Sequence, residues 1–473
     1  MYSMLRNVFT RVFTVVISFY VLIHYVLLLI NNGRLLALLS IVGIAALFFG
    51  LLLLKGKAAI LPLFLIFLAV VISIGNDGIT FFDLLWEGSR TMRSLIAMLL
   101  IVPIVGWVLK QENYVEDSII LLKRRLTNSK TFYFMLMFMT QLISFFLLFG
   151  SIAVVHQIVH TFFPDKDRYI WKMFKSTSVL RGFALTTIWV ISIPSFAFSV
   201  EVLDASLFVS LVQGFFLSLA GLLLAVFYLY VAEKKQQTAL SRDILRAIAK
   251  ASHHMDVNEN PGRVFVEFIL LFVSLLTLTL IVNGFMPVGL LTVIPIVVIV
   301  WALAYFLIKN KWRALFTEAK TYFSKGIALR SQEVILFLSA GLLITGLNQS
   351  GLSDDVMNGL YHWTEQIPGL NFLWVLPLIV MLFGFIGLGP LMVMVLIAEI
   401  IRSIHLPYPP ELIVLAMTLG STLSVMISPL VAPVLFLSSM NKLSPFENSA
   451  KQNWLFALSF YLLVELYIQF RIL

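Results

Sequence analysis

Long runs of hydrophobic residues follow one another along most of the chain, separated by short polar segments. A hydrocarbon core of about 30 Å needs roughly 20 apolar helical residues, and about 11 runs approach or exceed that length. The strands of an outer-membrane barrel alternate apolar and polar residues and give no such runs. The pattern therefore predicts an all-α polytopic membrane protein. The predicted spans are 8–30, 35–54, 59–75, 94–109, 182–203, 205–232, 264–282, 286–308, 331–348, 411–439 and 453–471.

Two further apolar stretches, 131–160 and 372–401, are longer than one crossing needs at the rise of an α-helix. The segments 110–130 and 164–181, which flank the first stretch, are both rich in Lys and Arg, and such segments stay in the cytoplasm. A single crossing would place them on opposite sides of the membrane. We therefore predict that 131–160 is a re-entrant hairpin, with its turn near Phe149–Ser151.

The same argument applies to 372–401, which follows a segment without Lys or Arg, 349–371, predicted to lie outside. A hairpin with its turn at 384–390 would return outside, so the two hairpins would open to opposite sides. The alternative is that both stretches are single long tilted helices. Between the two halves, the basic segment 233–263 carries apolar residues at helical spacing, which predicts an amphipathic helix on the anionic inner leaflet rather than a nucleic-acid site.

The span after each predicted hairpin contains a Ser and a Pro near its middle, as Ile-Ser-Ile-Pro at 191–194 and Ile-Ser-Pro at 427–429. A proline inside a helix removes a backbone hydrogen bond, and freed backbone groups in lipid need protein or a wet cavity. Two such breaks in corresponding halves predict two inverted repeats with a site between them. The predicted regions are a four-span scaffold (1–110), repeat 1 (111–232, with the broken helix 179–203), a linker (233–263) and repeat 2 (264–473, with the broken helix 411–439).

The helix breaks supply the candidate binding groups. Unwound backbone offers carbonyls to Na⁺ and N–H groups to a carboxylate, and hydroxyls serve either ion. The candidate substrate- or ion-binding residues are Gly150, Ser151, Thr187, Ser192, Pro194, Ser195, Gly387, Gly389, Pro390, Ser421, Thr422, Ser424, Ser428 and Pro429.

Three ionisable residues in the predicted hairpins are candidates for proton coupling. His156 and His160 are four residues apart and share a helix face, and Glu399 lies near the end of the second hairpin. The alternatives are an interfacial, structural histidine pair and a local ion pair between Glu399 and Arg402. Gln157 stands where a zinc protease would need a glutamate as its general base, which disfavours that class.

Composition narrows the class of protein further. Hydrophobic residues make up 60% of the chain and charged residues 12%, about half the charge of a soluble domain. The composition excludes a soluble globular enzyme and a disordered chain. In a membrane protein, a net charge of +9 indicates segments on the cytoplasmic side rather than binding to an acidic partner. With no cysteine and no nucleotide-binding motif, we expect no thiolate metal site, no cofactor and no enzymatic activity.

Several motifs of the C-terminal half together resemble a known family. Ser339–Gly341 precedes Asn348–Leu352, the predicted second hairpin follows, and Leu406–Pro410 leads to Gly420–Thr422 and the break at Ser428–Pro429. This order is similar to the ion transporter superfamily, in particular its divalent-anion:sodium symporter-like branches, over about residues 131–471. The resemblance implies two inverted repeats and an elevator-type movement. Hairpin tips of that family typically read Ser-Asn-Thr, and neither tip here contains Asn, so sodium coupling and dicarboxylate specificity are not carried over.

We therefore predict a secondary active transporter of an anionic solute, an organic acid or an oxyanion, driven by a Na⁺ or H⁺ gradient. Na⁺ is the candidate coupling ion that the chain would bind. We expect a multi-pass protein of a bacterial cytoplasmic membrane that forms a homodimer. The alternatives are a flippase or exporter of an amphipathic or lipid-linked substrate and a membrane assembly protein without transport activity.

Overall fold

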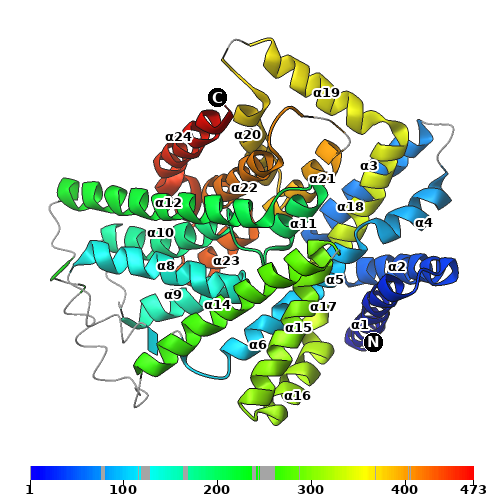
Figure 1. Cartoon of the computed structure of the whole chain (residues 1–473), viewed down its shortest axis with the longest axis horizontal. Coiled ribbons are helices and arrows are strands. Elements are labelled where there is room, and N and C mark those ends of the chain that lie inside the picture. The colour runs from blue at the N-terminus through cyan, green and yellow to red at the C-terminus, as the bar shows by residue number, and fades with distance from the viewer. Residues whose placement is uncertain are drawn as a thin grey trace. The chain divides into compact units, whose positions relative to one another are not determined.

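The helices of the computed structural model confirm an all-α polytopic membrane protein (Figure 1). In the residues that it describes, every regular element is helical, and ten helices are long and apolar enough to cross a membrane. The predicted amphipathic helix of the linker falls mostly outside those residues. The structure describes residues 2–75, 80–114, 117–118, 128–162, 169–236, 241–242, 244, 261–286, 288–367, 369–402, 404 and 406–472.

The chain forms two compact units, each assembled from separate segments of the sequence. Unit 1 comprises Met1–Trp107, Val288–Pro368 and Val395–Leu406, and unit 2 comprises Val108–Pro287, Gly369–Met394 and Pro407–Leu473. Both units therefore contain residues from both halves of the chain. The division into two inverted repeats stays a prediction.

Unit 1 is held together by close helix packing around α18 (Ser331–Ser350), which lies against α3 and α4. A side chain at Gly341 would meet the backbone of Gly88, so the two helices approach closely there, and Thr91 Oγ1 and Thr345 Oγ1 are 3.0 Å apart. The other helices of this unit are α1 (Tyr2–Leu29), α2 (Gly33–Leu53), α3 (Lys57–Ile74), α4 (Phe81–Thr91), α5 (Arg93–Ile101), η1 (Val102–Ile104), α15 (Leu290–Ile308), α16 (Trp312–Thr321), η2 (Tyr322–Gly326), α17 (Ile327–Leu329) and α19 (Leu352–Glu365).

The fourth span begins earlier than the sequence predicts, at Phe81 rather than at residue 94. Thr80 and Asp83 form a reciprocal capping box at its start, which satisfies backbone N–H groups that a helix start leaves free. Charged residues interrupt the apolar run here, but Glu87 and Arg90 pair with each other at 3.6 Å, one helical turn apart.

In unit 2, α8, α10 and α12 run side by side (Figure 1). Gly182 of α10 allows the close approach to α8, since a Cβ there would lie 2.8 Å from Thr140 Cβ. The helices of this unit are α8 (Ser129–Leu147), α9 (Gly150–Phe162), α10 (Tyr169–Thr186), α11 (Pro194–Val202), α12 (Leu207–Gln236), α14 (Pro261–Phe285), α20 (Phe372–Phe385), α22 (Pro410–Ile427), α23 (Ala432–Asn441), η3 (Glu447–Lys451) and α24 (Gln452–Ile472). The chain crosses between the units within α6 (Val105–Leu109) and α21 (Pro390–Arg402).

The sequence predicts that the helix after 164–181 begins at residue 182, and this start is wrong, because α10 begins at Tyr169. Lys172 is exposed, so its charge stays on the surface of the helix. Arg181 is buried, and its Nε donates a hydrogen bond of 2.9 Å to Asn453 Oδ1 in α24. The local sequence, which is rich in basic residues, predicts an exposed segment here. The hydrogen bond to Asn453, distant in the sequence, allows Arg181 to be buried in a helix instead.

Both predicted hairpin stretches are interrupted, so the alternative of a single long helix is wrong. Between α8 and α9, Leu148 has a left-handed backbone (φ 49°), and the Ser144 and Ser151 hydroxyls are 2.7 Å apart. Residues seven apart in a continuous helix are separated by about 10 Å, so the chain turns back here. Between α20 and α21 the turn covers 386–389 and contains Gly387 with φ 88°. The side of the membrane on which each stretch opens stays a prediction.

Candidate functional site

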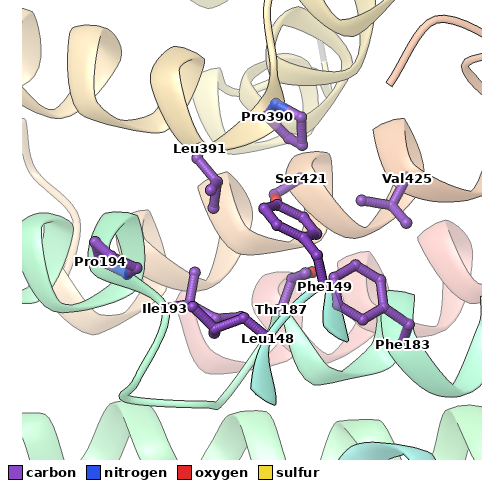
Figure 2. Close-up of a pocket in the computed structure, with 10 residues that line it drawn as sticks. All are labelled: Leu148, Phe149, Phe183, Thr187, Ile193, Pro194, Pro390, Leu391, Ser421 and Val425. Atoms are coloured by element: carbon purple, nitrogen blue, oxygen red, sulfur yellow. The ribbon is translucent and has the colours of Figure 1, made fainter. Parts of the chain in front are cut away.

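The first helix break of unit 2 faces α22, the helix that precedes the second break, at a small cavity of about 20 Å³ (Figure 2). This volume suits about one water molecule. Its walls are mostly apolar, and the only hydroxyl side chains among its lining residues are those of Thr187 and Ser421. The cavity is lined by Leu148, Phe149, Phe183, Thr187, Ile193, Pro194, Pro390, Leu391, Ser421 and Val425.

Three helices begin at this cavity. Leu148 and Phe149 come directly before α9, Ile193 and Pro194 mark the start of α11, and Pro390 and Leu391 are the first residues of α21. The first turn of a helix has N–H groups without helical partners and the positive end of the helix dipole. Helix N-terminal ends are therefore suited to an anion such as a carboxylate. Proline at the start of α11 and α21 fits this position, because its missing N–H is not needed there.

Ser421 is the cavity-lining group most available to a ligand. Its side chain is fully buried, and its Oγ has no hydrogen-bond partner in the described part of the chain. A buried hydroxyl without a partner costs about 1–3 kcal/mol relative to a paired one. A ligand or a water molecule in the cavity would remove that cost.

A hydroxyl pair joins the two broken helices. Thr187, at the end of α10, and Thr422, in α22, have their Oγ1 atoms 2.8 Å apart, and both side chains are buried. Each Oγ1 also lies 2.8 Å from a carbonyl oxygen of its own helix, Ala184 O or Thr418 O. These contacts place the first break beside α22, the helix that leads to the second break.

The serine of each break donates a hydrogen bond to the helix that opens the predicted hairpin of the same half, α8 or α20. Ser192 Oγ donates a 2.6 Å hydrogen bond to Phe145 O near the end of α8. Ser428 Oγ donates a 2.8 Å bond to Gly384 O near the end of α20. Both hydroxyls are thereby occupied within the protein, so these two candidates position the backbone of the breaks.

The remaining candidates lie near the cavity without being among its lining residues. Ser195 and Ser424 are buried, and their hydroxyls have no hydrogen-bond partner among the described residues. A Cβ at Gly384 would overlap Ser424 Oγ, which shows how closely α20 and α22 pack. Ser151 Oγ donates to Leu148 O at 2.7 Å. Gly150 is the first residue of α9, Gly387 and Gly389 lie in the turn before α21, and Pro429 lies in the second break.

The candidates for proton coupling are also absent from the lining residues. The rings of His156, which is buried, and His160, which is exposed, have centroids 6.2 Å apart. Glu399 lies in unit 1 and pairs with Arg402 at 3.7 Å, as the alternative interpretation predicts. A coupling role for these three residues stays a prediction.

Sequence reasoning missed the apolar part of the wall: Leu148, Phe183, Ile193, Leu391 and Val425 were not singled out, and Phe149 was assigned only to a turn. Most of these residues adjoin a predicted turn or break, and this proximity is the feature of the sequence that indicates them as possible lining residues. Phe183 and Val425 lie within helices, and nothing in their local sequence separates them from residues that face lipid.

The fold and the site define a membrane carrier, and comparison with known proteins identifies its family. Residues 173–469, more than half of the chain, match the DcuC family, described as C4-dicarboxylate anaerobic carrier. The chain belongs to this family. The matched range contains all the candidate residues except Gly150, Ser151, His156 and His160. A search of curated proteins found no match.

A solved structure has a similar fold. The YdaH transporter of Alcanivorax borkumensis, described as having an unusual topology, matches with a TM-score of 0.55 at 13% identity, over 87% of this chain and 97% of that chain. At this identity the likeness concerns the fold alone. The family match supports a membrane transporter, and neither comparison supports the divalent-anion:sodium symporter branch specifically, so that resemblance stays a prediction.

Proposed function

We propose that this chain is a secondary carrier of C4-dicarboxylates in a bacterial cytoplasmic membrane, driven by a Na⁺ or H⁺ gradient. The observation that carries the proposal is the meeting of three helix N-terminal ends and the unpaired Ser421 hydroxyl at one cavity. The chain belongs to a family described by that substrate class, which supports the choice among anions.

One substrate carboxylate would be bound at the starts of α9, α11 and α21. The ten lining residues include no Lys, Arg or His, so recognition would depend on backbone N–H groups, helix dipoles and hydroxyls. Ser421 Oγ would donate to the carboxylate, a type of hydrogen bond that contributes about 1.5–3 kcal/mol.

The cavity must enlarge before it binds a four-carbon dianion, since it suits about one water molecule. We therefore assign the structure to a conformation in which the site is closed. All ten lining residues belong to unit 2, so substrate would travel with that unit as a whole. This supports an elevator-like movement, with unit 1 as the static part.

Uptake by the purified full-length protein in proteoliposomes tests the proposal. We expect labelled succinate to accumulate under an inward Na⁺ or H⁺ gradient, and an excess of another C4-dicarboxylate, but not of acetate, to compete. Ser421→Ala should raise the KM for succinate about tenfold, because a hydrogen bond to a charged group is lost.

Ser339→Ala is the matched control for this variant. Ser339 is also fully buried with an unpaired hydroxyl, but it lies in α18 of unit 1. We expect its KM to equal that of the wild-type protein. Absence of C4-dicarboxylate uptake by the wild-type protein under both gradients would overturn the proposed function, and an unchanged KM in Ser421→Ala would overturn the proposed site.

A further inference from the structure

The last helix of unit 2 contains one acidic side chain inside an apolar run. Glu465 of α24 is fully buried. Its Oε1 has no hydrogen-bond partner in the described part of the chain, and its Oε2 accepts one long bond, 3.3 Å from Gln469 Nε2. It belongs to none of the ion pairs found among the described residues.

Among the described residues, no cation of the elements packed against α24 forms an ion pair with Glu465. In α20 there is no titratable side chain, and in α22 the only one is Glu411, in the first turn, which accepts a hydrogen bond from Ser206 N at 2.9 Å. Arg181 of α10 binds Asn453, twelve residues or about 18 Å earlier in α24. The other titratable groups of α10 besides Arg181 are Tyr169, Lys172 and Lys175, all earlier in that helix. The other titratable groups on α24, α12 and η3 are Tyr461, Tyr467, Arg471, Tyr228, Tyr230, Glu233, Lys234, Lys235, Glu447 and Lys451.

Most of these groups have partners of their own. Arg471 donates to Tyr467 Oη at 3.0 Å, and Lys451 pairs with Glu447 at 3.3 Å. Tyr461 Oη donates to Trp374 O at 2.8 Å. A carboxylate buried without a cation costs several kcal/mol. Burial without a paired cation therefore favours the neutral acid form of Glu465 over the carboxylate in this conformation.

Resting on the carrier function proposed above, we propose that Glu465 is the proton-binding site that couples an H⁺ gradient to transport. It binds one proton from water on one side of the membrane. When the movement of the carrier hydrates the side chain, it releases that proton to water on the other side. The step needs no reagent other than the proton, because Glu465 alternates between its acid and its carboxylate.

A short hydrogen-bond chain connects Glu465 to the second predicted hairpin. Gln469 Nε2 is shared between Glu465 Oε2 at 3.3 Å and Asn371 Oδ1 at 3.4 Å, and Asn371 Nδ2 donates to Gln469 Oε1 at 2.6 Å. Asn371 caps the start of α20 by accepting from Leu373 N and Trp374 N at 3.1 and 3.3 Å.

The protonation state of Glu465 selects between these two acceptors. A carboxylate attracts the Gln469 amide more strongly than a neutral acid does, because hydrogen bonds to charged groups are about twice as strong. Loss of the proton therefore draws Gln469 away from the cap of α20. This helix leads through the turn at 386–389 to Pro390 at the cavity, and its Gly384 O receives the bond from Ser428.

The test compares wild-type protein with Glu465→Gln in proteoliposomes whose membrane potential is clamped. The glutamine has the shape and charge of the protonated acid but releases no proton. With the wild-type protein, an inward gradient of one pH unit should concentrate succinate up to about tenfold, the equivalent of one proton. Glu465→Gln should bring succinate only to its external concentration, while succinate exchange at equal pH continues.

Retained exchange shows that the Glu465→Gln variant is folded and that its substrate site is intact. Glu333→Gln, which removes the acid that pairs with Arg330 at the start of α18 in unit 1, serves as the control and should still accumulate succinate. Accumulation by Glu465→Gln at the wild-type ratio, or loss of accumulation in Glu333→Gln alone, would overturn the inference. Wild-type uptake driven by Na⁺ and unaffected by pH would overturn it too, while leaving the proposed function intact. If the wild-type protein exchanges no C4-dicarboxylate, the proposed function itself fails.

Discussion

The break between α10 and α11 and the break between α22 and α23 are anchored in the same way. In each, a serine hydroxyl donates to a carbonyl near the end of the helix that opens the preceding predicted hairpin: Ser192 to Phe145 O and Ser428 to Gly384 O. A glycine of each broken helix also packs on that same opening helix, Gly182 on α8 and Gly420 on α20. The same contacts thus recur in the two halves, and the inverted orientation of the halves stays a prediction.

The two breaks differ in length and burial. The first covers seven residues, 187–193, and all of them are buried. The second covers four, 428–431, and Leu430 is 50% exposed. Buried backbone groups need partners inside the protein, whereas exposed ones have alternatives. We therefore expect the first break to be the rigid part of the site and the second to be the part that adapts.

The glycine contacts should give the largest effects. A Cβ at residue 420 would lie 2.5 Å from Pro377 O, and a Cβ at residue 182 would lie 3.0 Å from Met137 O. Gly420→Val should therefore destabilise the protein by about 3 kcal/mol and Gly182→Val by slightly less, as expected for overpacking. Thermal midpoints in detergent measure both effects. Gly359→Val, where nothing lies within 4 Å, is the control, and equal midpoints in all three variants would show that the close packing has no energetic weight.

The serine bonds test the difference in burial directly. Ser192→Ala should cost about 1–2 kcal/mol, because a buried carbonyl loses its donor. Ser428→Ala should cost less than 1 kcal/mol, about half as much, because Gly384 O keeps a 3.2 Å bond from Gly387 N. Denaturation of the two variants in detergent measures the order. Ser199→Ala is the control, since its hydroxyl bonds only to Ser195 O in its own helix, and a larger loss in Ser428→Ala would contradict the assignment of rigidity to the first break.

The breaks and turns could be predicted because their causes are local. Pro194 and Pro429 lack the N–H that a helix interior uses, and each follows a serine at its break, whereas Pro62 and Pro295 lie inside continuous helices. Gly387 allows the left-handed backbone of the turn before α21. The turn at 386–389 lies inside the predicted 384–390. The first turn lies at Leu148–Phe149, slightly before the predicted Phe149–Ser151, and Leu148 gives no sequence signal for its left-handed backbone.

Other features depend on partners distant in the sequence and could not be predicted. Helix α10, which begins at Tyr169, contains the buried Arg181. The side chain of Arg181 donates a hydrogen bond to Asn453, a residue distant in the sequence. Four candidates, Thr187, Pro194, Pro390 and Ser421, line the cavity, but the pairing of Thr187 with Thr422 joins residues 235 positions apart. A single sequence contains no signal for such pairs.

The smallest expected effect concerns the contact that joins the first break to α22, the helix that leads to the second break. In a double-mutant cycle with Thr187→Val and Thr422→Val, we expect a coupling energy of about 0.5–1 kcal/mol. The value should be modest because each hydroxyl also bonds to a carbonyl of its own helix. Thr186→Val with Thr418→Val is the control pair, whose hydroxyls bond to Gly182 O and Leu415 O within their own helices, and its coupling should be zero within error. Zero coupling between Thr187 and Thr422 as well would show that their contact contributes no free energy of interaction. The hydroxyl pair would then have no part in the site.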